Sequence, residues 1–363
     1  MLFFMETKTD HVFLEDIRVR LGFDGKLVMD ATGICGGLCF FWSHSDKKYW
    51  PIVGEKVIKA CLGVLNEGEG LEMVNKTLII MIPKVKRLER ISRFRPISLG
   101  NVIYKNCSEA FTNRFRNVLD EVISETQSAF IPGRLILDNG IVGFECMHAL
   151  RRKKKGKKGS LALKLDMSKA YDRMEWDFLS GMMTRLGFSA SWVNRIMRCV
   201  QSFFFSHLIN GEVYGLMKPS RGLRQGDPLY PYLFLICVED LSQLLQIVER
   251  SRKLMGFQCS RGGPKITHLF FADDSMIFTL AVEKDCQIIS QVLNVYEKAS
   301  GQVVNFQKSA ICVSKGVSKH KALAQILGVR LVRCHERYLG FPSFAGQNKR
   351  EMFTNIEIGC GRE

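Results

Sequence analysis

The stretch HLFFADDSMIF, residues 268–278, constrains the fold more than any other part of the sequence. Large apolar residues flank two adjacent carboxylates, Asp273 and Asp274, and each apolar run is typical of a strand. The four residues from Ala272 to Ser275 are short enough to form a hairpin turn. Because Asp is also common in purely structural turns, this stretch alone leaves a chemical role open.

A second stretch, SLALKLDMSKAYDRMEW (160–176), places leucine at every second position from Leu161 to Leu165. This period of two predicts a strand with its leucines on one sheet face and Asp166 on the other. Asp166 would then stand at the carboxyl end of the strand, where a carboxylate can reach a ligand. Ser168 is predicted to cap a following helix.

The composition favours a globular, nucleic-acid-binding protein. Of 363 residues, 46% are apolar and 24% charged, which argues against disorder. The formal net charge is +16, which favours a polyanionic partner, most simply nucleic acid. A merely basic surface is the alternative.

The cysteines and the apolar runs point to an intracellular protein, in the nucleus, the cytoplasm or both. The 12 cysteines form no C-x-x-C pair, so we expect free, reduced thiols. No apolar run approaches the ~18 residues of a membrane span, and the N-terminus does not resemble a signal peptide. We therefore expect no membrane association.

Further elements can be predicted along the chain. Residues 48–70 have the spacing of an amphipathic helix with Ile58, Cys61, Leu62 and Leu65 on its apolar face, and residues 77–83 read as a buried strand. Residues 36–42, GGLCFFW, also predict a strand. The segment 151–159 holds seven cations in nine positions and predicts a flexible loop.

The stretch PSRGLRQGDPLYPYLFLICVED predicts an exposed loop followed by a helix. The loop would present Arg221, Arg224 and Gln225 to solvent. Asp227 followed by Pro228 fits a helix N-cap and its first residue.

Three carboxylates suggest a metal-dependent reaction. Nucleotidyl transfer uses two divalent cations that activate the attacking hydroxyl and stabilise the leaving oxygen. Mg²⁺ takes a few carboxylate oxygens and keeps other positions for water and phosphate. Asp166 at a strand end and the pair at a hairpin tip meet that demand. We expect Asp273 to share both ions with Asp166, and Asp274 to contribute less.

The order of the motifs resembles the reverse transcriptase of a plant non-LTR (LINE-type) retrotransposon. The resemblance runs from about residue 70 to 345 and rests on nine stretches in the family's order. They are NKTLIIMIPK, FRPISLGNVIYK, QSAFIPGRLILDN, LALKLDMSKAYDRMEWDFL, NGEVYG, PSRGLRQGDPL, HLFFADDSMIF, SGQVVNFQKS and RYLGFPS.

The resemblance implies an α+β, right-hand polymerase fold. Its fingers and palm would be present, the palm an antiparallel sheet backed by helices, and its thumb largely missing. The implied activity is RNA-directed DNA polymerisation, in which deoxynucleotides are added to a primer 3′-hydroxyl. The implied cofactors are two Mg²⁺ ions, with Mn²⁺ as an alternative, and the partners are an RNA template, a DNA primer and deoxynucleoside triphosphates.

The same resemblance assigns the site residues. Asp166, Asp273 and Asp274 would be the catalytic, metal-binding triad. Tyr171 resembles the bulky gate that excludes a ribose 2′-hydroxyl, with an ordinary core aromatic as the alternative. The implied nucleotide-binding residues are Lys84, Arg95, Tyr171, Gln225, Gly226 and Lys308. For Lys84, Arg95 and Lys308 the alternative is a surface cation.

The first residues resemble a different domain. ETK and GGLCFFW look like the interior of the endonuclease that precedes the polymerase in such elements, with Glu6 matching its metal-binding Glu. The other endonuclease motifs are absent, so we predict that this fragment does not cut DNA. The predicted division is 1–45 endonuclease-like fragment, 46–75 helical linker region, 76–345 fingers and palm, and 346–363 start of a C-terminal region.

Some residues depart from the family pattern. Tyr230 replaces a usual small Ser, Arg93 replaces an acidic residue, and Cys107 and Ser108 stand where the family is more apolar. Two hypotheses therefore remain at this point: a reverse transcriptase, or a catalytically inactive remnant that binds nucleic acid through its charge.

Overall fold

The structure is a computed structural model in which parts of the 363-residue chain are described. The described residues are 2–4, 15, 18–19, 25–29, 38–42, 44–66, 68, 70–83, 94–152, 159–260, 262–333, 337–339 and 341–342. The predictions for Glu6, Lys84, Arg93, most of the cationic loop and residues 346–363 lie outside them.

The chain forms two compact units, each built from two separate segments. The first comprises Met1–Phe115 and Met183–Tyr232, and the second comprises Arg116–Met182 and Leu233–Glu363. The domain division predicted from the sequence stays a prediction.

The first unit combines two sheets with helices. Its strands are β1 (Leu2–Phe4), β2 (Gly25–Met29), β3 (Leu38–Trp42), β4 (Lys76–Pro83), β5 (Phe94–Gly100), β7 (Phe204–Ile209) and β8 (Glu212–Met217). Its helices are α2 (His44–Asn66), α3 (Leu71–Val74), α4 (Val102–Arg116, up to Phe115) and α8 (Ala190–Gln201). The helix α7 (Trp176–Arg185) ends in this unit.

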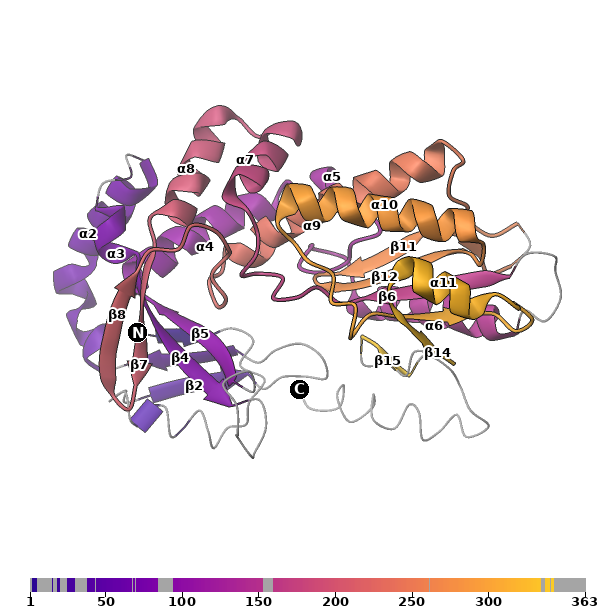
Figure 1. Ribbon diagram of the computed structural model, residues 1–363. Helices are drawn as coiled ribbons and strands as arrows, with labels where there is room; N and C mark the ends of the chain where they lie inside the picture. Colours follow the sequence, from indigo (N-terminus) through magenta and orange to yellow (C-terminus); the bar gives the residue numbers. More distant parts are fainter. Residues whose placement is uncertain are drawn as a thin grey trace. The chain divides into compact units, whose positions relative to one another are not determined.

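The first unit's larger sheet has the order β5-β4-β7-β8, and β1-β3-β2 form the smaller one (Figure 1). The predicted strand at 77–83 is confirmed as part of β4, and the described part of 36–42 forms β3. Helix α4 buries Phe111 and Phe115, whose rings contact the Trp192 ring of α8 edge-on at centroid distances of 5.4 and 5.5 Å. These aromatic contacts join α4 to α8 in the core.

The second unit is a sheet covered by helices. Its helices are α5 (Leu119–Val122), α6 (Ile136–Arg152), most of α7, most of α9 (Tyr230–Arg250), α10 (Glu283–Ser300) and α11 (His320–Leu327). Its strands are β6 (Ser160–Leu165), β9 (Phe257–Gln258), β10 (Lys265–Ile266), β11 (His268–Phe271), β12 (Asp274–Leu280), β13 (Ala310–Val313), β14 (Arg330–Val332), β15 (Arg337–Tyr338) and β16 (Phe341–Pro342).

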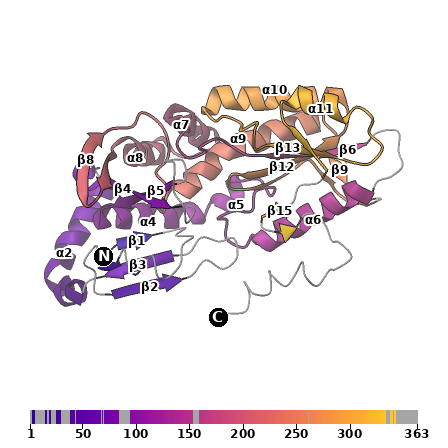
Figure 2. The same ribbon diagram turned by 60° about the horizontal axis from the view of Figure 1, so that its bottom comes forward.

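The main sheet of the second unit has the order β11-β12-β6-β13-β14. All its pairings are antiparallel except β13 with β14. Figures 1 and 2 show α6 on one face of this sheet and α10 on the other. Alternate residues of β6 and β12, among them Ala162 and Phe278, pack with Met147 and Leu150 of α6. Consecutive residues such as Leu161, Ala162 and Leu163 of β6, and Met276, Ile277 and Phe278 of β12, are all buried, so both faces of these two strands are covered.

The predicted strand at 160–165 and the predicted hairpin at 268–278 are both confirmed. β11 and β12 pair antiparallel, and β12 pairs antiparallel with β6. The turn holds two residues, Ala272 and Asp273, rather than the four expected, because Phe271 already pairs with Asp274. Asp274 therefore begins β12.

Two local predictions were wrong. Ile58 and Leu62 of α2 are half-exposed, Cys61 and Leu65 are partly buried and Val64 is buried, so the buried face of this helix differs from the expected one. Ser168 does not cap a helix: its N–H donates to the Val303 carbonyl (2.8 Å), and α7 begins only at Trp176. A long-range backbone contact replaced the local cap that the sequence suggested.

The expectation that no segment is long and apolar enough to span a membrane fails for one helix. α9 passes that test by length and composition, but 61% of the relevant window is buried inside the fold. Its residues Leu233, Cys237 and Leu241 are almost completely enclosed by protein. This burial is typical of a core helix.

Candidate functional site

Asp166 follows directly after β6 and is held by its backbone. Its N–H donates to Ser309 Oγ (3.0 Å), and its carbonyl accepts the N–H of Asn305 (2.8 Å). The side chain is 37% exposed. Two contacts from the segment that follows α10 thus fix the main chain while the carboxylate stays accessible.

Asp274 lies level with Asp166 across the sheet. Leu165 pairs with Ser275, so continuing the antiparallel register by one residue brings Asp166 opposite Asp274. Paired positions share a sheet face. Asp273 is the second residue of the turn and is exposed. The structure therefore brings the three predicted carboxylates to one end of two neighbouring strands. The unequal sharing of ions between Asp273 and Asp274 stays a prediction.

Two lysines lie beside these carboxylates. Lys308 Nζ is 3.8 Å from Asp166 Oδ1, and Lys164 Nζ is 3.9 Å from Asp274 Oδ1. Lys308 is 69% exposed, so its ion pair is solvated and its side chain can reorient. The sequence-predicted Lys308 is thus next to the predicted triad, whereas Lys164 was not singled out.

The donor set fits divalent ions of the magnesium type. Carboxylate oxygens on a strand end and a tight turn are hard ligands, and their partial exposure leaves positions for water and phosphate. Among the described residues, no group of three or more His, Cys, Asp or Glu side chains is already gathered closely enough to hold a metal. The carboxylates would complete such a site only with further oxygen ligands, as Mg²⁺ sites commonly do.

Tyr171 lies in the second unit, five positions after Asp166 in the sequence. Its ring stacks on Phe234 of α9 at a centroid distance of 4.6 Å and an interplanar angle of 17°. The side chain is partly buried. This stacking fixes the ring and fits either a rigid gate or an ordinary core aromatic, the two readings that the sequence left open.

The remaining predicted nucleotide-binding residues belong to the first unit. Arg95 lies in β5 opposite Ile82 of β4. The Ser98 N–H of the same strand donates to the Gln225 carbonyl (3.3 Å). Gly226 has φ of 95°, and a Cβ there would lie 3.4 Å from the Ser98 carbonyl oxygen. Gln225 and Gly226 therefore lie beside β5, the strand that contains Arg95. Glycine occurs where the backbone of this pair passes closest to the strand.

Arg224 was wrongly expected in an exposed loop. It is buried and donates to Asn75 Oδ1 (2.6 Å) and Thr77 Oγ1 (2.5 Å), and it lies 3.1 Å from Asp227 Oδ2. Its guanidinium also lies 4.3 Å from the centroid of the Tyr104 ring. Arg224 thus ties the loop to β4 and α4 rather than meeting a ligand.

Asp227 and Ser108 complete this buried polar cluster. The Ser108 hydroxyl donates to Asp227 Oδ1, which also accepts the Leu229 N–H (3.0 Å). Asp227 therefore caps the chain just before α9, which begins at Tyr230 rather than at Pro228. Ser108 occupies a position where the family is more apolar, and its hydroxyl donates a hydrogen bond to this carboxylate. A polar residue where the family is more apolar was visible in the sequence, but its partner was not.

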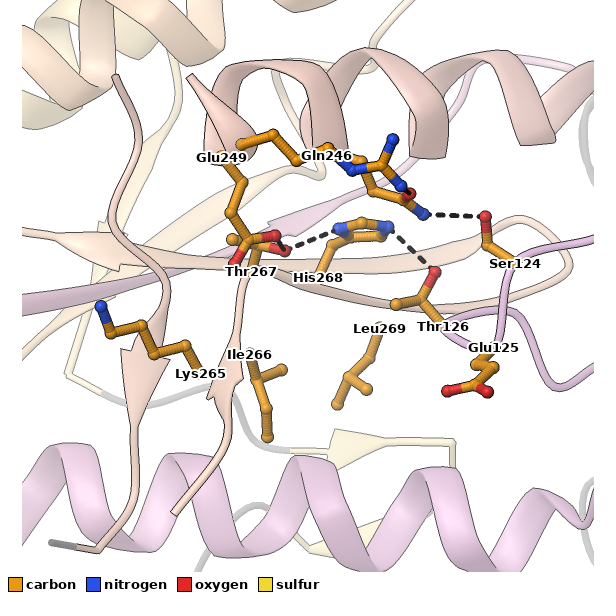
Figure 3. Close-up of a pocket in the computed structure, with 11 residues that line it drawn as sticks. Ser124, Glu125, Thr126, Gln246, Glu249, Lys265, Ile266, Thr267, His268 and Leu269 are labelled. Atoms are coloured by element: carbon orange, nitrogen blue, oxygen red, sulfur yellow. Dashed lines mark hydrogen bonds between the residues drawn. The ribbon is translucent and has the colours of Figure 1, made fainter. Parts of the chain in front are cut away.

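A pocket of about 580 Å³ lies elsewhere in the second unit, around His268 at the start of β11 (Figure 3). His268 Nε2 is 2.9 Å from Thr126 Oγ1 and 2.8 Å from Ser242 Oγ, and Nδ1 is 3.1 Å from Thr267 Oγ1. Burial lowers the pKa of His268 to about 4. The ring is therefore neutral at pH 7. Four residues of strand, roughly 13 Å, separate His268 from the turn, so this pocket is not the carboxylate site.

Comparison with known proteins identifies the class. The family "Reverse transcriptase (RNA-dependent DNA polymerase)" matches residues 82–342. This chain belongs to the reverse transcriptase family. Its fold class is the right-hand polymerase fold expected from the sequence, with the antiparallel sheet of the second unit backed by helices.

Two of the relatives are proteins of transposable elements. The chain is 28% identical over 263 residues to an uncharacterized 149 kDa protein of transposon TX1 from Xenopus laevis, covering 72% of this chain and 19% of that protein. It is 26% identical over 243 residues to the Pol polyprotein of the R2DM element of Drosophila melanogaster, covering 58% and 22%. The chain therefore spans about a fifth of the length of these two relatives.

Two further similarities concern a shorter segment and the fold. An uncharacterized mitochondrial protein of Arabidopsis thaliana is 51% identical over 73 residues, or 20% of this chain and 60% of that protein. The apo telomerase structure from Candida tropicalis gives a TM-score of 0.49 at 13% identity, covering 83% of this chain and 54% of that chain. The family assignment does not depend on the telomerase similarity.

Proposed function

We propose that this chain is an RNA-directed DNA polymerase of a LINE-type retrotransposon of plant origin, adding deoxynucleotides to the 3′-hydroxyl of a primer on an RNA template. One observation carries the proposal. The backbone of Asp166 is held by hydrogen bonds, and Asp166 lies level with Asp274, which directly follows the turn residue Asp273. The 51% identity to the Arabidopsis thaliana segment supports the plant origin.

The three carboxylates would hold two Mg²⁺ ions, or Mn²⁺ in their place. Such ions supply activation of the primer hydroxyl and neutralise charge on the reacting phosphates. The residues themselves provide fixed negative charge at a rigid strand end. Lys308, close to Asp166 and exposed, would neutralise the pyrophosphate that leaves.

The other residues would bind the nucleotide. Arg95 and Lys84 would contact its triphosphate, and Gln225 with Gly226 would line the nucleotide and template-primer pocket. Tyr171, held by its stack on Phe234, would exclude a ribose 2′-hydroxyl and so select deoxynucleotides. Localisation in the nucleus, the cytoplasm or both is part of the same proposal.

Residues 1–45 would be an endonuclease-like fragment that contains Glu6 and does not cut DNA. Mg²⁺-dependent nicking of a supercoiled plasmid by the purified chain would contradict this assignment.

Primer extension tests the main proposal. The assay uses an RNA template with an annealed DNA primer, deoxynucleotides and Mg²⁺. We expect extension by the natural chain and a loss of at least about 100-fold in Asp166→Asn and Asp273→Asn, since removing one charge-stabilising group typically costs 10²–10³ in rate. Glu283→Gln serves as the matched control, because this exposed carboxylate pairs with Lys319 (2.9 Å) at the start of α10.

The alternative is a catalytically inactive nucleic-acid-binding remnant, which the family relatives do not favour. If the natural chain binds template-primer at low salt but does not extend the primer, the result would contradict the polymerase and support that remnant.

A further inference from the structure

The outer edge of β11 is bonded to a segment that lies far away in the sequence. Phe270 N–H donates to the Thr126 carbonyl (2.8 Å), and Ser128 N–H donates to the Phe270 carbonyl (3.1 Å). Gln127 forms a parallel bridge with Phe270. We call Thr126–Ser128 the edge segment. It pairs with β11 of the β11–β12 hairpin, on the side opposite β12.

The edge segment carries a buried side chain that reaches the turn. Gln127 is 1% exposed, and its Oε1 accepts the N–H groups of Ala129 (3.0 Å) and Ala272 (3.0 Å). Two converging N–H donors require an oxygen at this position, which fixes the orientation of the amide. Its Nε2 has no hydrogen-bond partner among the described residues. The amide thus acts through its oxygen.

Ala272 needs such a contact. Its φ is 51°, in the left-handed region that L-residues other than Asn and Asp rarely adopt. Alanine has no polar side chain to stabilise this conformation locally. The bond from Ala272 N–H to Gln127 Oε1 stabilises it from outside, immediately before Asp273 and Asp274.

The edge segment is itself held firmly. The Arg134 guanidinium donates to the carbonyls of Gln127 (2.7 Å), Ser124 (2.6 Å) and Ile123 (3.0 Å). Asn139 Nδ2 donates to the Phe270 carbonyl (2.9 Å). The oxygen of Gln127 therefore projects from a rigid support, which is what precise placement of a reacting group requires.

We infer that Gln127 is a positioning residue for the metal-binding carboxylates, acting through the Ala272 backbone. This inference rests on the proposed function, since it concerns the carboxylates that function assigns. Gln127 does not touch substrate. By holding Ala272, it fixes the direction in which the turn presents Asp273 and the point at which β12 starts, Asp274.

The test compares Gln127→Met, which keeps length but removes the acceptor, with Thr126→Val as matched control. The Thr126 side chain is bonded at the His268 end of β11 and does not reach the turn. We expect Gln127→Met to lower kcat about 10- to 100-fold with KM for deoxynucleotides within about 3-fold, because sub-ångström misplacement acts mainly on the chemical step. Thr126→Val should keep kcat within about 3-fold at a comparable loss of thermal stability.

Two further measurements address the turn directly. Hydrogen exchange at the Ala272 amide should be faster in Gln127→Met and unchanged in Thr126→Val. Ala272→Gly tolerates positive φ, so adding it to Gln127→Met should restore part of kcat. Unchanged exchange, equal loss of kcat in Gln127→Met and Thr126→Val, or no recovery in the double variant would each overturn the inference. If the natural chain extends no primer, the polymerase proposal fails, while exchange at Ala272 still decides whether Gln127 holds the turn.

Discussion

At the scale of single residues, two clusters of buried polar side chains hold distant parts of the chain together. Arg224, Ser108 and Asp227 form one cluster in the first unit. His268 and its three hydroxyl partners form another in the second unit. Each cluster joins segments far apart in the sequence. A buried polar group costs stability unless it is bonded, so such clusters favour one arrangement of those segments.

His268 gives a residue-scale prediction about pH. Burial lowers its pKa to about 4, whereas an unfolded histidine titrates near 6.5. Below pH 6.5 the unfolded chain takes up a proton that the folded chain does not bind. The free energy of unfolding should therefore decrease as the pH is lowered from 6.5 to about 4, by up to about 3 kcal/mol from this group, and then level off at lower pH.

Urea unfolding at several pH values measures this effect. His268→Gln should lose this part of the pH dependence, while the control His207→Gln, on β7 of the first unit, should keep it. Parallel pH profiles for the natural chain and His268→Gln would contradict the assignment.

At the scale of elements, the connection after α10 sets the site. Gly301 ends this helix with φ of 75°. The chain then passes through Val303 and Asn305, which bond to Ser168 and Asp166. The carboxyl end of β6 is thus fixed by a turn more than 130 residues later in the sequence.

Two glycines that end helices provide a matched pair for testing that turn. A Cβ on Gly301 would lie 2.7 Å from the Arg173 carbonyl oxygen, whereas one on Gly328, after α11, would meet only the Phe306 ring at 3.4 Å. Both have positive φ, so both share the cost of about 1 kcal/mol for alanine in that region.

Gly328→Ala should therefore lower the free energy of unfolding by about 1 kcal/mol. Gly301→Ala should lower it by about 3 kcal/mol, because the backbone clash adds to the conformational cost. Denaturant titration measures both. Equal losses would show that the contact with Arg173 relaxes without cost.

At the scale of the whole molecule, the charge of +16 dominates. Binding to nucleic acid through phosphates releases counterions, so affinity falls steeply with salt. The carboxylates of the site contribute little to the attraction between the protein and phosphate groups, because they are negatively charged and would bind metal cations.

We therefore expect affinity for an RNA–DNA template-primer to fall by roughly 10³-fold or more between 50 and 200 mM salt, as for six or more phosphate contacts. Asp273→Asn should leave this slope unchanged. Fluorescence anisotropy in a salt series measures it, and a flat profile would rule out phosphate contacts as the main source of affinity.

Local sequence patterns were enough to predict the secondary-structure elements of the site. Alternating leucines before Asp166 and apolar runs around Asp273 and Asp274 specify strands, because side chains in a strand alternate between faces. The order of the motifs also identified the family. Local signals failed at Ser168 and Arg224, where distant partners replaced the capping and solvent contacts that neighbouring residues suggested.

Which of these segments meet followed from the folded structure and not from any local pattern. It brought Asp166 level with Asp274, placed Lys308 beside Asp166 and aimed the Gln127 oxygen at Ala272. Periodicity in a sequence records which face a side chain occupies, but it does not record the register between strands or the loop that bonds to a free sheet edge. Those depend on the burial and hydrogen bonding of groups more than 100 residues apart, which are satisfied only when the whole fold forms.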